Sequence, residues 1–191
     1  EPDLSISAPQ ERESMEFDVV IAGGGPAGLA TACHLATLAR ARQQELRICV
    51  LEKGSEIGAH IISGALFDPR ALTELFPDWR NMGAPVTSAV SSEAVYYLAN
   101  AKAALRIPDM LLPADLHNKG NYVISLANLC RWLAQHAEAL GVEILTGFSA
   151  AQLMEDHSGR ITGVITGDMG VGKNGEQLAN YTPGYALHAR Y

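Results

Sequence analysis

The sequence lacks any long hydrophobic run, and acidic residues outnumber basic ones. No apolar stretch approaches the roughly 18 residues needed to span a bilayer. Lysine and arginine number 14 against 21 aspartate and glutamate residues, which gives a formal net charge of -7 and a pI near 5.3. These values argue against a nucleic-acid-binding surface and against a polybasic membrane anchor.

Cysteine is also scarce, and its spacing excludes the usual metal-binding patterns. The chain has three cysteines, none of which belongs to a C-x-x-C pair. Cys33, Cys49 and Cys130 therefore cannot bind an iron–sulfur cluster or a zinc ion among themselves. Thiols scattered over expected core positions are typical of packing residues in a reducing, cytoplasmic protein.

Other potential chemistry is equally sparse. The six histidines show no metal-binding spacing, and we expect them to be ordinary surface or core residues. Trp79 and Trp132 lie in helical patterns and are expected to serve in packing. Residues 1–14 are acidic, polar and contain proline, which is typical of a disordered tail rather than of a signal or transit peptide.

The most informative segment is a short apolar run that leads directly into a group of glycines. Residues 17–22 read Phe-Asp-Val-Val-Ile-Ala, which predicts a short buried strand. Gly23, Gly25 and Gly28 follow with the spacing G-x-G-x-x-G, and helix-forming residues come next. Glycine at these positions allows a sharp turn, then close approach of a pyrophosphate to the backbone, then close packing of the helix on the sheet.

A second expected strand ends in an acidic residue. Residues 47–52 read Arg-Ile-Cys-Val-Leu-Glu, and a carboxylate at Glu52 would accept hydrogen bonds from the ribose hydroxyls of an adenine dinucleotide. Glu52 lies slightly farther from Gly28 than the usual ~20 residues. The polar stretch 39–45 explains the difference as a long helix end or loop. The sequence therefore predicts a dinucleotide-binding βαβ unit.

The α/β rhythm then changes. Residues 53–65 are rich in glycine and small residues and permit close approach of a ligand or another backbone. A short helix is expected at 68–76, opened by an aspartate and a proline. Residues 81–121 interrupt the alternation of strands and helices and contain an expected β-hairpin at 95–107.

The last third of the chain returns to helix and strand. Ser125 predicts the N-cap of a helix that stops at Gly141. A short strand is expected at 142–145, a second hairpin at 150–165, and a further strand of the same small sheet at 185–191.

One segment resembles a phosphate-binding loop but departs from it at the decisive position. Residues 167–174 nearly fit G-x-x-x-x-G-K-[ST], yet Asn174 replaces the hydroxyl that binds magnesium. Asn174 and Gly175 form a turn signal where a helix should begin. We expect a loop between strands and no nucleoside triphosphate site.

These elements predict an α/β fold, a Rossmann-like domain that binds FAD or NAD(P). The expected type is the three-layer ββα arrangement of glutathione reductase, with an inserted β-hairpin and a small β-meander. The glycine pattern alone does not separate NAD from FAD. A dinucleotide fold interrupted by an insertion favours a flavoprotein whose FAD domain is split by a substrate domain.

Longer stretches of the sequence resemble electron-transfer flavoprotein–ubiquinone oxidoreductase. They are residues 52–60, 63–65 and 68–69, residues 117–122, residues 137–143 and residues 166–171. The resemblance extends over about residues 12–191 and is more specific than the glycine pattern. The sequence of residues 122–132 is similar to that of bacterial members of the family.

The resemblance implies an enzyme in which FAD and a four-iron four-sulfur cluster pass electrons from reduced electron-transfer flavoprotein to ubiquinone. It also implies a peripheral protein at the cytoplasmic face of the bacterial inner membrane, or at the mitochondrial inner membrane in a eukaryote. The glycines of residues 23–28 would hold the pyrophosphate, Glu52 the ribose, and the 58–65 loop the rest of the FAD. The cofactor-binding candidates are Gly23, Gly25, Pro26, Ala27, Gly28, Glu52, Lys53, Gly58, Ser63, Gly64, Ala65 and Ala150.

The implied domain organisation is a first FAD-binding part at 15–80, an insertion of the quinone-binding domain at 81–121, and a second FAD-binding part at 122–191. Members of the family are several hundred residues longer, and their cluster cysteines and second FAD motif come after the point that corresponds to Tyr191. Related flavin folds often carry an arginine where this chain has Ser125. We therefore expect an N-terminal portion that is inactive alone.

Two alternatives stay open. One is a related cluster-free FAD oxidoreductase, of a geranylgeranyl-reductase-like or nitrogen-fixation-associated type, and the other is a non-catalytic truncated FAD-binding module. Met110, Leu111 and Leu112 are candidates for a shallow apolar membrane contact, with burial beneath the hairpin as the equal alternative. No residue is expected to act as a catalytic acid, base or nucleophile.

Overall fold

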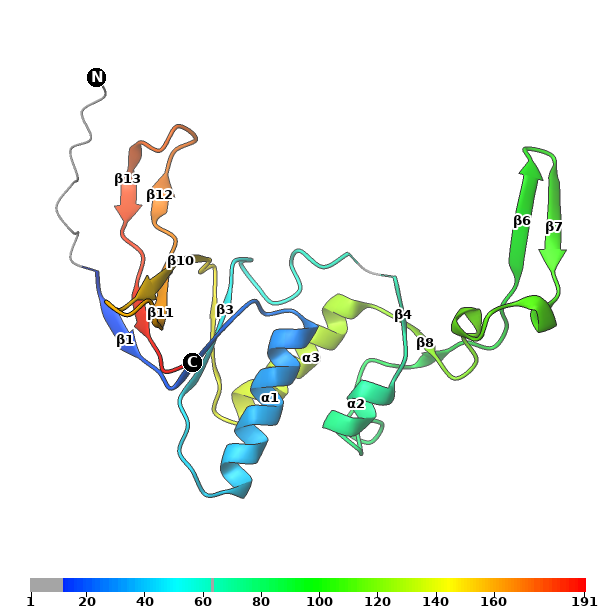
Figure 1. The fold of residues 1–191 in the computed structure, drawn as a ribbon, viewed down its shortest axis with the longest axis horizontal. Helices are drawn as coiled ribbons and strands as arrows, with labels where there is room; N and C mark the ends of the chain where they lie inside the picture. Colours follow the sequence, from blue (N-terminus) through cyan, green and yellow to red (C-terminus); the bar gives the residue numbers. More distant parts are fainter. Residues whose placement is uncertain (1–11, 63) are drawn as a thin grey trace. The chain divides into compact units, whose positions relative to one another are not determined.

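The structure, a computed structural model, describes residues 12–62 and 64–191 and divides them into two compact units (Figure 1). The first unit combines the N-terminal part of the chain with residues 130–191, and the second consists of residues 62–129. The insertion predicted at 81–121 lies within this second unit. The chain is built from helices and strands, which confirms the predicted α/β class.

A three-stranded parallel sheet forms the centre of the first unit. Its strands, in spatial order, are β2 (Val19–Ala22), β3 (Ile48–Glu52) and β9 (Glu143–Thr146). Residues 48–51 are fully buried, which explains the uninterrupted apolar sequence of the central strand. The expectation of a buried first strand is wrong in degree, because β2 is an edge strand of this sheet and its residues are half-buried or exposed.

Two helices cover one face of this sheet, as right-handed crossovers between parallel strands require. They are α1 (Pro26–Ala41) and α3 (Leu126–Ala139), and the last ten residues of α3 belong to the first unit. The thiol of Cys33 lies 3.5 Å from the carbonyl oxygen of Leu133, so the two helices touch. The predicted ends of α3 are confirmed: the Ser125 hydroxyl accepts a hydrogen bond from the N–H of Asn128 at 3.4 Å, and Gly141 follows with φ of 92°.

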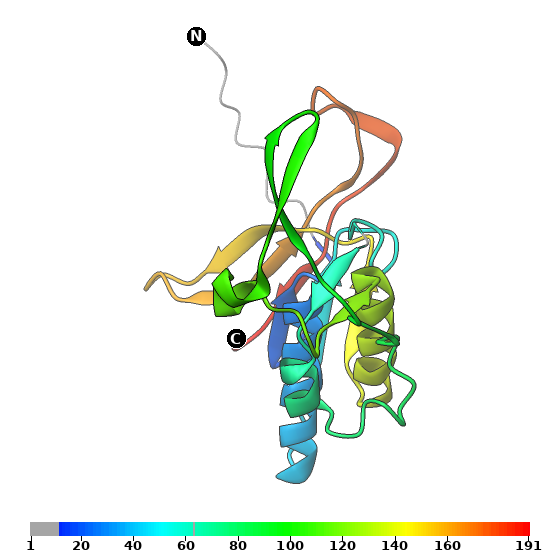
Figure 2. The same ribbon diagram turned by 90° about the vertical axis from the view of Figure 1, so that its right-hand side faces the viewer.

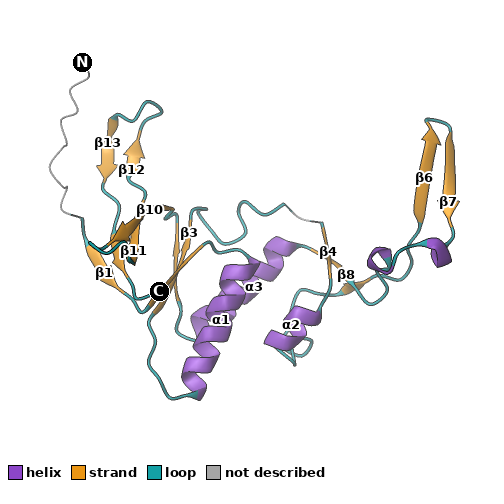
Figure 3. Ribbon diagram, viewed as in Figure 1, coloured by secondary structure: helices purple, strands orange, loops and turns teal. Residues whose placement is uncertain are grey.

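An antiparallel sheet covers the other face. Its strands, in spatial order, are β1 (Ser14–Glu16), β14 (Ala186–His188), β11 (Ile161–Thr166) and β10 (Ala150–Glu155). Val164 and Leu187 of this sheet pack against Cys49 and Leu51 of β3, and Phe17 completes the buried cluster. The first unit is thus a three-layer arrangement of helices, parallel sheet and antiparallel sheet, with the elements coloured by type in Figure 3.

A two-stranded ribbon extends from the antiparallel sheet. It consists of β12 (Met169–Val171) and β13 (Gln177–Thr182), which pair with each other (Figures 1 and 2). The segment 167–174 supplies the first strand and the start of the turn, where the N–H of Asn174 donates to the Glu176 carboxylate at 3.0 Å. The expectation of a loop between strands holds for residues 172–174, whereas residues 169–171 form a strand that was not predicted.

The second unit contains a small antiparallel sheet and a separate hairpin. Its elements are β4 (Ala65–Phe67), α2 (Arg70–Leu75), β5 (Ser88–Ala89), β6 (Val95–Asn100), β7 (Ala103–Ile107), the 3-10 helices η1 (Asp109–Leu111) and η2 (Ala114–Leu116), and β8 (Tyr122–Ile124). The sheet order is β4-β8-β5, and β6 pairs with β7 as predicted. Trp79 is 2% exposed and packs edge-on against Tyr122 at a centroid distance of 5.9 Å, which confirms its predicted packing role.

The segment 117–122 is held by one carboxylate. Glu93 accepts hydrogen bonds from the backbone N–H of Asn118 at 2.7 Å and from its side-chain amide at 3.0 Å. These bonds lower the pKa of Glu93, with the backbone N–H of Asn118 as the largest cause. The ring of His117 lies 3.4 Å from the same carboxylate.

Within the described part of the chain, every helix is too short or too polar to traverse a lipid bilayer.

The end of the predicted tail is fixed in the structure. Residues 1–11 lie outside the described residues, but Arg12 pairs with Asp168 at 2.5 Å and Ser14 begins β1, so the expectation of disorder is wrong for residues 12–14. Asp168 also accepts hydrogen bonds from the N–H of Gly184 at 2.8 Å and from the hydroxyl of Tyr181 at 3.0 Å. The Arg12 hydrogen bond, then that of Gly184, lower the pKa of Asp168 to about 2.

We expect Asp168→Asn to destabilise the first unit, because asparagine keeps the shape but removes the charge that three donors approach. The free energy of unfolding, measured by urea titration at pH 7, should fall by about 1–3 kcal/mol. Because the folded pKa of about 2 lies below the ordinary value of 3.8, the difference from the unmodified chain should be full above about pH 4. This difference in the free energy of unfolding should disappear as the pH falls through about 2.

The matched control is Asp115→Asn, which removes the same charge from an exposed position. Equal stability of Asp168→Asn and this control at pH 7 would contradict the assignment.

Candidate functional site

The carboxyl end of β2 leads directly into the glycine-rich loop. Gly23 has φ of 110°, a conformation that glycine adopts without strain and other residues rarely adopt. Its N–H donates to the carbonyl oxygen of Leu51 in β3 at 2.8 Å. The sharp turn predicted at Gly23 is therefore confirmed.

The N-terminus of α1 lies immediately after this turn. Gly25 is the N-cap residue and Pro26 is the first helical residue, so the first turn contains one position without an N–H. No side chain caps this end, and the first turn carries no acidic residue. The free N–H groups and the positive end of the helix dipole are thus available to an anion.

Space is available at this helix end. A Cβ added at Gly25 would meet no heavy atom of the described residues within 4 Å. A pyrophosphate can therefore approach the backbone here as the spacing of the glycines predicts.

Gly28 serves packing. A Cβ at this position would lie below 3.0 Å from the carbonyl oxygen of Gly23 and 3.2 Å from Cγ2 of Ile21. No side chain fits between α1 and the loop at this point. The close approach of helix and sheet predicted for Gly28 is confirmed.

Glu52 lies at the end of β3, beside the same loop. One carboxylate oxygen, Oε2, accepts the N–H of Gly24 at 3.0 Å, and the other, Oε1, accepts the N–H of Gly54 at 2.7 Å. Gly24 and Gly54 were not among the predicted site residues. The signals that could have found them are the third consecutive glycine in residues 23–25 and a glycine two positions after the carboxylate.

The loop after β3 is joined to the chain that follows β9. The N–H of Gly147 donates to the carbonyl oxygen of Gly54 at 2.7 Å, and the N–H of Phe148 donates to that of Glu52 at 2.9 Å. These bonds bring the approach to Ala150, the exposed first residue of β10, to the glycine-rich edge.

The remaining predicted residues are placed as follows. Pro26 and Ala27 lie in the first turn of α1, while Lys53 is exposed and Gly58 is buried, with φ of 85°. Gly64 and Ala65 belong to the second unit, and Ser63 lies outside the described residues. The structure therefore gathers the predicted residues of the first unit at one sheet edge, and their contact with a cofactor stays a prediction.

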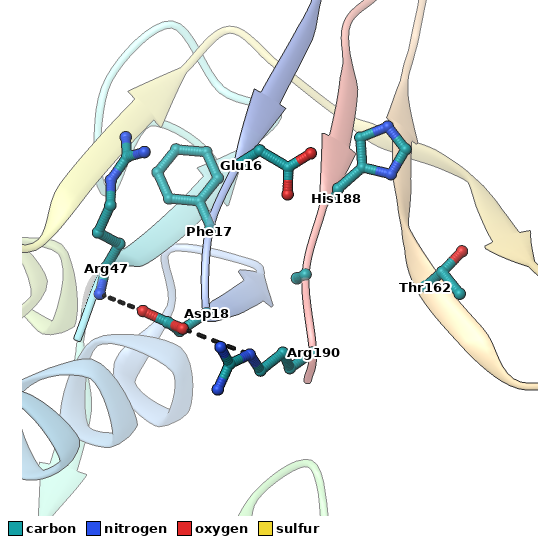
Figure 4. Close-up of a pocket in the computed structure, with 8 residues that line it drawn as sticks. Glu16, Phe17, Asp18, Arg47, Thr162, His188 and Arg190 are labelled. Carbon is teal, nitrogen blue, oxygen red and sulfur yellow. Dashed lines mark hydrogen bonds and ion pairs between the residues drawn. The ribbon is translucent and has the colours of Figure 1, made fainter.

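Two grooves of the first unit lie elsewhere. One has a volume of about 380 Å³ and is bordered by Phe17, Asp18, Arg47 and Arg190, among others (Figure 4). Asp18 accepts the N–H of Arg47 at 2.9 Å and lies 3.7 Å from Nε of Arg190. Since Asp18 and Arg47 precede β2 and β3, this groove is at the edge opposite the glycine-rich loop. Ligands of open α/β sheets bind at the carboxyl ends of the strands, so this groove is not the predicted site.

The second groove lies at the same amino-terminal edge. It is bordered by Ala39 near the end of α1, by Leu140 after α3, and by Ile48 and Val142 at the starts of β3 and β9. The argument from strand ends excludes it as the dinucleotide site as well.

The cysteines are unsuited to nucleophilic chemistry. Burial raises the pKa of Cys49 to about 12 and the pKa values of Cys33 and Cys130 to about 11. Thiols of this kind are protonated at neutral pH and inert. Among the residues that the structure describes, no group of three or more histidine, cysteine, aspartate or glutamate side chains could hold a metal ion.

Residues 21–78 match the family model of the NAD(P)-binding Rossmann-like domain. This match covers the end of β2, the glycine-rich loop, α1 and β3, the elements that build the site. The fold and this match thus define a protein with a Rossmann-like domain of the NAD(P)-binding type.

Sequence relatives narrow this class. The chain is 54% identical over 182 residues to electron transfer flavoprotein-ubiquinone oxidoreductase of Pseudomonas aeruginosa, a match of 95% of this chain and 33% of that protein. It is 42% identical over 181 residues to the mitochondrial protein of the same name from Homo sapiens, covering 94% and 29%. The chain is a homologue of the N-terminal third of electron transfer flavoprotein–ubiquinone oxidoreductases, which confirms the resemblance found in the sequence. It spans about a third of the length of the curated relatives it matches.

Solved structures support the fold. A geranylgeranyl bacteriochlorophyll reductase-like protein from Thermoplasma acidophilum has a TM-score of 0.60 at 18% identity, over 93% of this chain and 38% of that one. The myxobacterial chondrochloren halogenase, a variant of FAD-dependent halogenases, has a TM-score of 0.55 at 19% identity, over 92% and 36%. At these identities the likeness concerns the fold alone.

We expect Gly25, the N-cap of α1, and Gly28, in its first turn, to respond differently to alanine in the absence of any ligand. Gly28→Ala should lower the free energy of unfolding by about 1–3 kcal/mol, because its Cβ overlaps the carbonyl oxygen of Gly23. Gly25→Ala should change it by less than about 0.5 kcal/mol, because its Cβ enters open space. Urea unfolding followed by circular dichroism measures both, and similar losses for the two variants would contradict the packing described here.

Proposed function

We propose that this chain is the FAD-binding portion of an electron-transferring-flavoprotein–ubiquinone oxidoreductase. The observation that carries the proposal is the uncapped, open N-terminus of α1 facing the edge where Glu52 ends β3. The identity of 54% to the Pseudomonas aeruginosa oxidoreductase supports the choice of reaction class.

The residues of this edge fit the adenosine and pyrophosphate parts of FAD. The N–H groups of the first turn of α1 would bind the pyrophosphate, with Gly25 leaving the room that a side chain would fill. Glu52 would accept hydrogen bonds from the ribose hydroxyls, and Lys53, Gly58 and Ala150 would border the cofactor from the adjoining loops. When bound, FAD would supply the electron-accepting and electron-donating chemistry between the partner flavoprotein and the quinone.

The four-iron four-sulfur cluster does not fit this chain. The three cysteines of this chain are buried, free and far apart in sequence. Among the described residues, no group of side chains could hold a metal ion. We assign the cluster ligands to the part of the relatives that this chain does not span, and we expect no electron transfer to ubiquinone from this chain alone.

A geranylgeranyl-reductase-like activity is the second candidate from the sequence. The solved structure of that type shares the fold at 18% identity, whereas the oxidoreductase relatives reach 42–54%. The proposed partners are therefore electron-transfer flavoprotein and ubiquinone. The formal net charge of -7 argues against a nucleic-acid partner.

The second unit offers a surface for a membrane-associated role. Met110 is 89% and Leu111 70% exposed in η1, so the alternative of burial beneath the hairpin is wrong for these two; Leu112 is half-buried. Tyr97 and Leu98 of the neighbouring hairpin are exposed too. We propose a shallow, peripheral contact with the bacterial inner membrane, or with the mitochondrial inner membrane in a eukaryote.

Gly25→Val tests the cofactor assignment. The branched side chain would occupy the space proposed for the pyrophosphate, so FAD binding should be lost while the circular dichroism spectrum stays that of the unmodified chain. Flavin absorbance after gel filtration with added FAD measures this. A normal flavin content in the variant would show that the loop does not hold FAD.

The double variant Met110→Ser/Leu111→Ser tests the membrane contact. Each fully buried apolar side chain is worth ~1.5–3 kcal/mol, so binding to liposomes in a flotation assay should weaken about tenfold or more. Met169→Ser/Val171→Ser, which changes two exposed apolar residues of the first unit, is the control and should bind as the unmodified chain does. Equal binding by both variants would place the contact elsewhere.

A further inference from the structure

The carboxylate of Glu52 is bonded to two separate loops. Gly24 lies in the loop between β2 and α1, and Gly54 lies in the loop that follows β3. Each donates its backbone N–H to a different oxygen of the same carboxylate, at 3.0 Å and 2.7 Å. Hydrogen bonds to an ionised acceptor are stronger than neutral ones, so this pair ties the two loops together.

The space for a side chain is tight at both glycines, because of the same carboxylate and its neighbours. A Cβ at Gly24 would lie below 3.0 Å from Cδ1 of the buried Ile57 and 3.1 Å from Oε2 of Glu52. A Cβ at Gly54 would lie 3.1 Å from Oε1 of Glu52 and 3.2 Å from the carbonyl oxygen of Glu56. A side chain at Gly24 or Gly54 would thus press on the Glu52 carboxylate, and at Gly24 also on Ile57.

The bonding has a consequence for the donors at the site. The N–H of Gly24 points to Glu52 and is not available to a pyrophosphate, which leaves this task to the N–H groups that follow it. The carboxylate oxygens each have a backbone donor, and a ribose hydroxyl would use their remaining lone pairs.

We propose that Glu52 is a positioning residue that fixes the separation of the 23–25 and 53–58 loops before a dinucleotide binds, in addition to any bond with the ribose. The inference rests on the proposed FAD site for its effect on affinity, but the bonding itself requires no cofactor. A glutamine has one acceptor oxygen where glutamate has two, so it can satisfy one of the two glycine N–H groups and presents N–H to the other.

Glu52→Gln separates this role from a ribose contact alone. In the chain without cofactor, hydrogen exchange at the amide of Gly24 or of Gly54 should become about tenfold faster. This factor corresponds to the loss of one hydrogen bond worth about 1.4 kcal/mol. Glu56→Gln is the matched control, since it removes the same charge from an exposed side chain of the same loop. It should leave both amides protected.

Two ligands complete the test. ADP carries the ribose hydroxyls and the pyrophosphate, whereas 2′,3′-dideoxy-ADP lacks the hydroxyls. If Glu52 positions the loops, Glu52→Gln should weaken the binding of the dideoxy ligand about tenfold, and that of ADP by at least as much, because ADP also loses its ribose contact. If Glu52 acts through the ribose alone, Glu52→Gln should bind the dideoxy ligand as tightly as the unmodified chain does. That binding, together with unchanged hydrogen exchange at Gly24 and Gly54, would overturn the proposal.

The failure of the proposed function would be seen separately. If the unmodified chain bound neither ADP nor FAD, the FAD assignment would fall, while the hydrogen exchange of Gly24 and Gly54 would still decide whether Glu52 joins the loops. If Glu52→Gln does not fold, Glu52→Asp provides the second variant. Aspartate keeps the charge but is one methylene shorter and cannot reach both amides, so the same acceleration of exchange is expected, and its absence would overturn the proposal.

Discussion

The packing of β3 between two layers is the constraint on which the first unit depends. Cys49 and Leu51 face Val164 and Leu187 of the antiparallel sheet, while Ile48 and Val50 alternate to the side of the helices. Because both faces are covered, the direction and register of this strand determine where its last residue, Glu52, emerges. Phe17 joins the same cluster, so the segment that forms β1 and then β2 is held against both sheets at the point where it passes from one to the other. The functional edge of the molecule is therefore positioned by core packing rather than by the loops themselves.

Much of this arrangement follows from local sequence. Capping and stop residues suffice for α3, because Ser125 caps its start and Gly141 follows its end. The G-x-G-x-x-G spacing gives the backbone geometry at Gly23 and the packing at Gly28, since both depend on the missing Cβ and hardly on distant residues. The hairpin at 95–107 is equally local.

The features that sequence reasoning missed are those set by partners far along the chain. Arg12 is held by Asp168, 156 positions later, and no local sequence pattern predicts this pair. The bond from Gly24 to Glu52 joins residues 28 positions apart and depends on where β2 and β3 end beside each other. The half-burial of β2 depends on its place in the sheet order, which its own apolar sequence does not disclose. The strand at 65–67 pairs with β8, more than fifty positions later, although it follows the glycine-rich stretch.

The buried thiols of the first unit can report how often its layers open. Cys33 lies in α1, Cys49 in β3 and Cys130 in α3, and all three are fully enclosed. A thiol reagent can reach them only when the layer that contains them separates from its neighbours, and the reaction then needs the thiolate that burial disfavours. The rate of labelling at each cysteine therefore reports how often the helix layer parts from the sheet and how often the sheet itself opens. The scarcity of cysteine makes these three signals separable, one for each element.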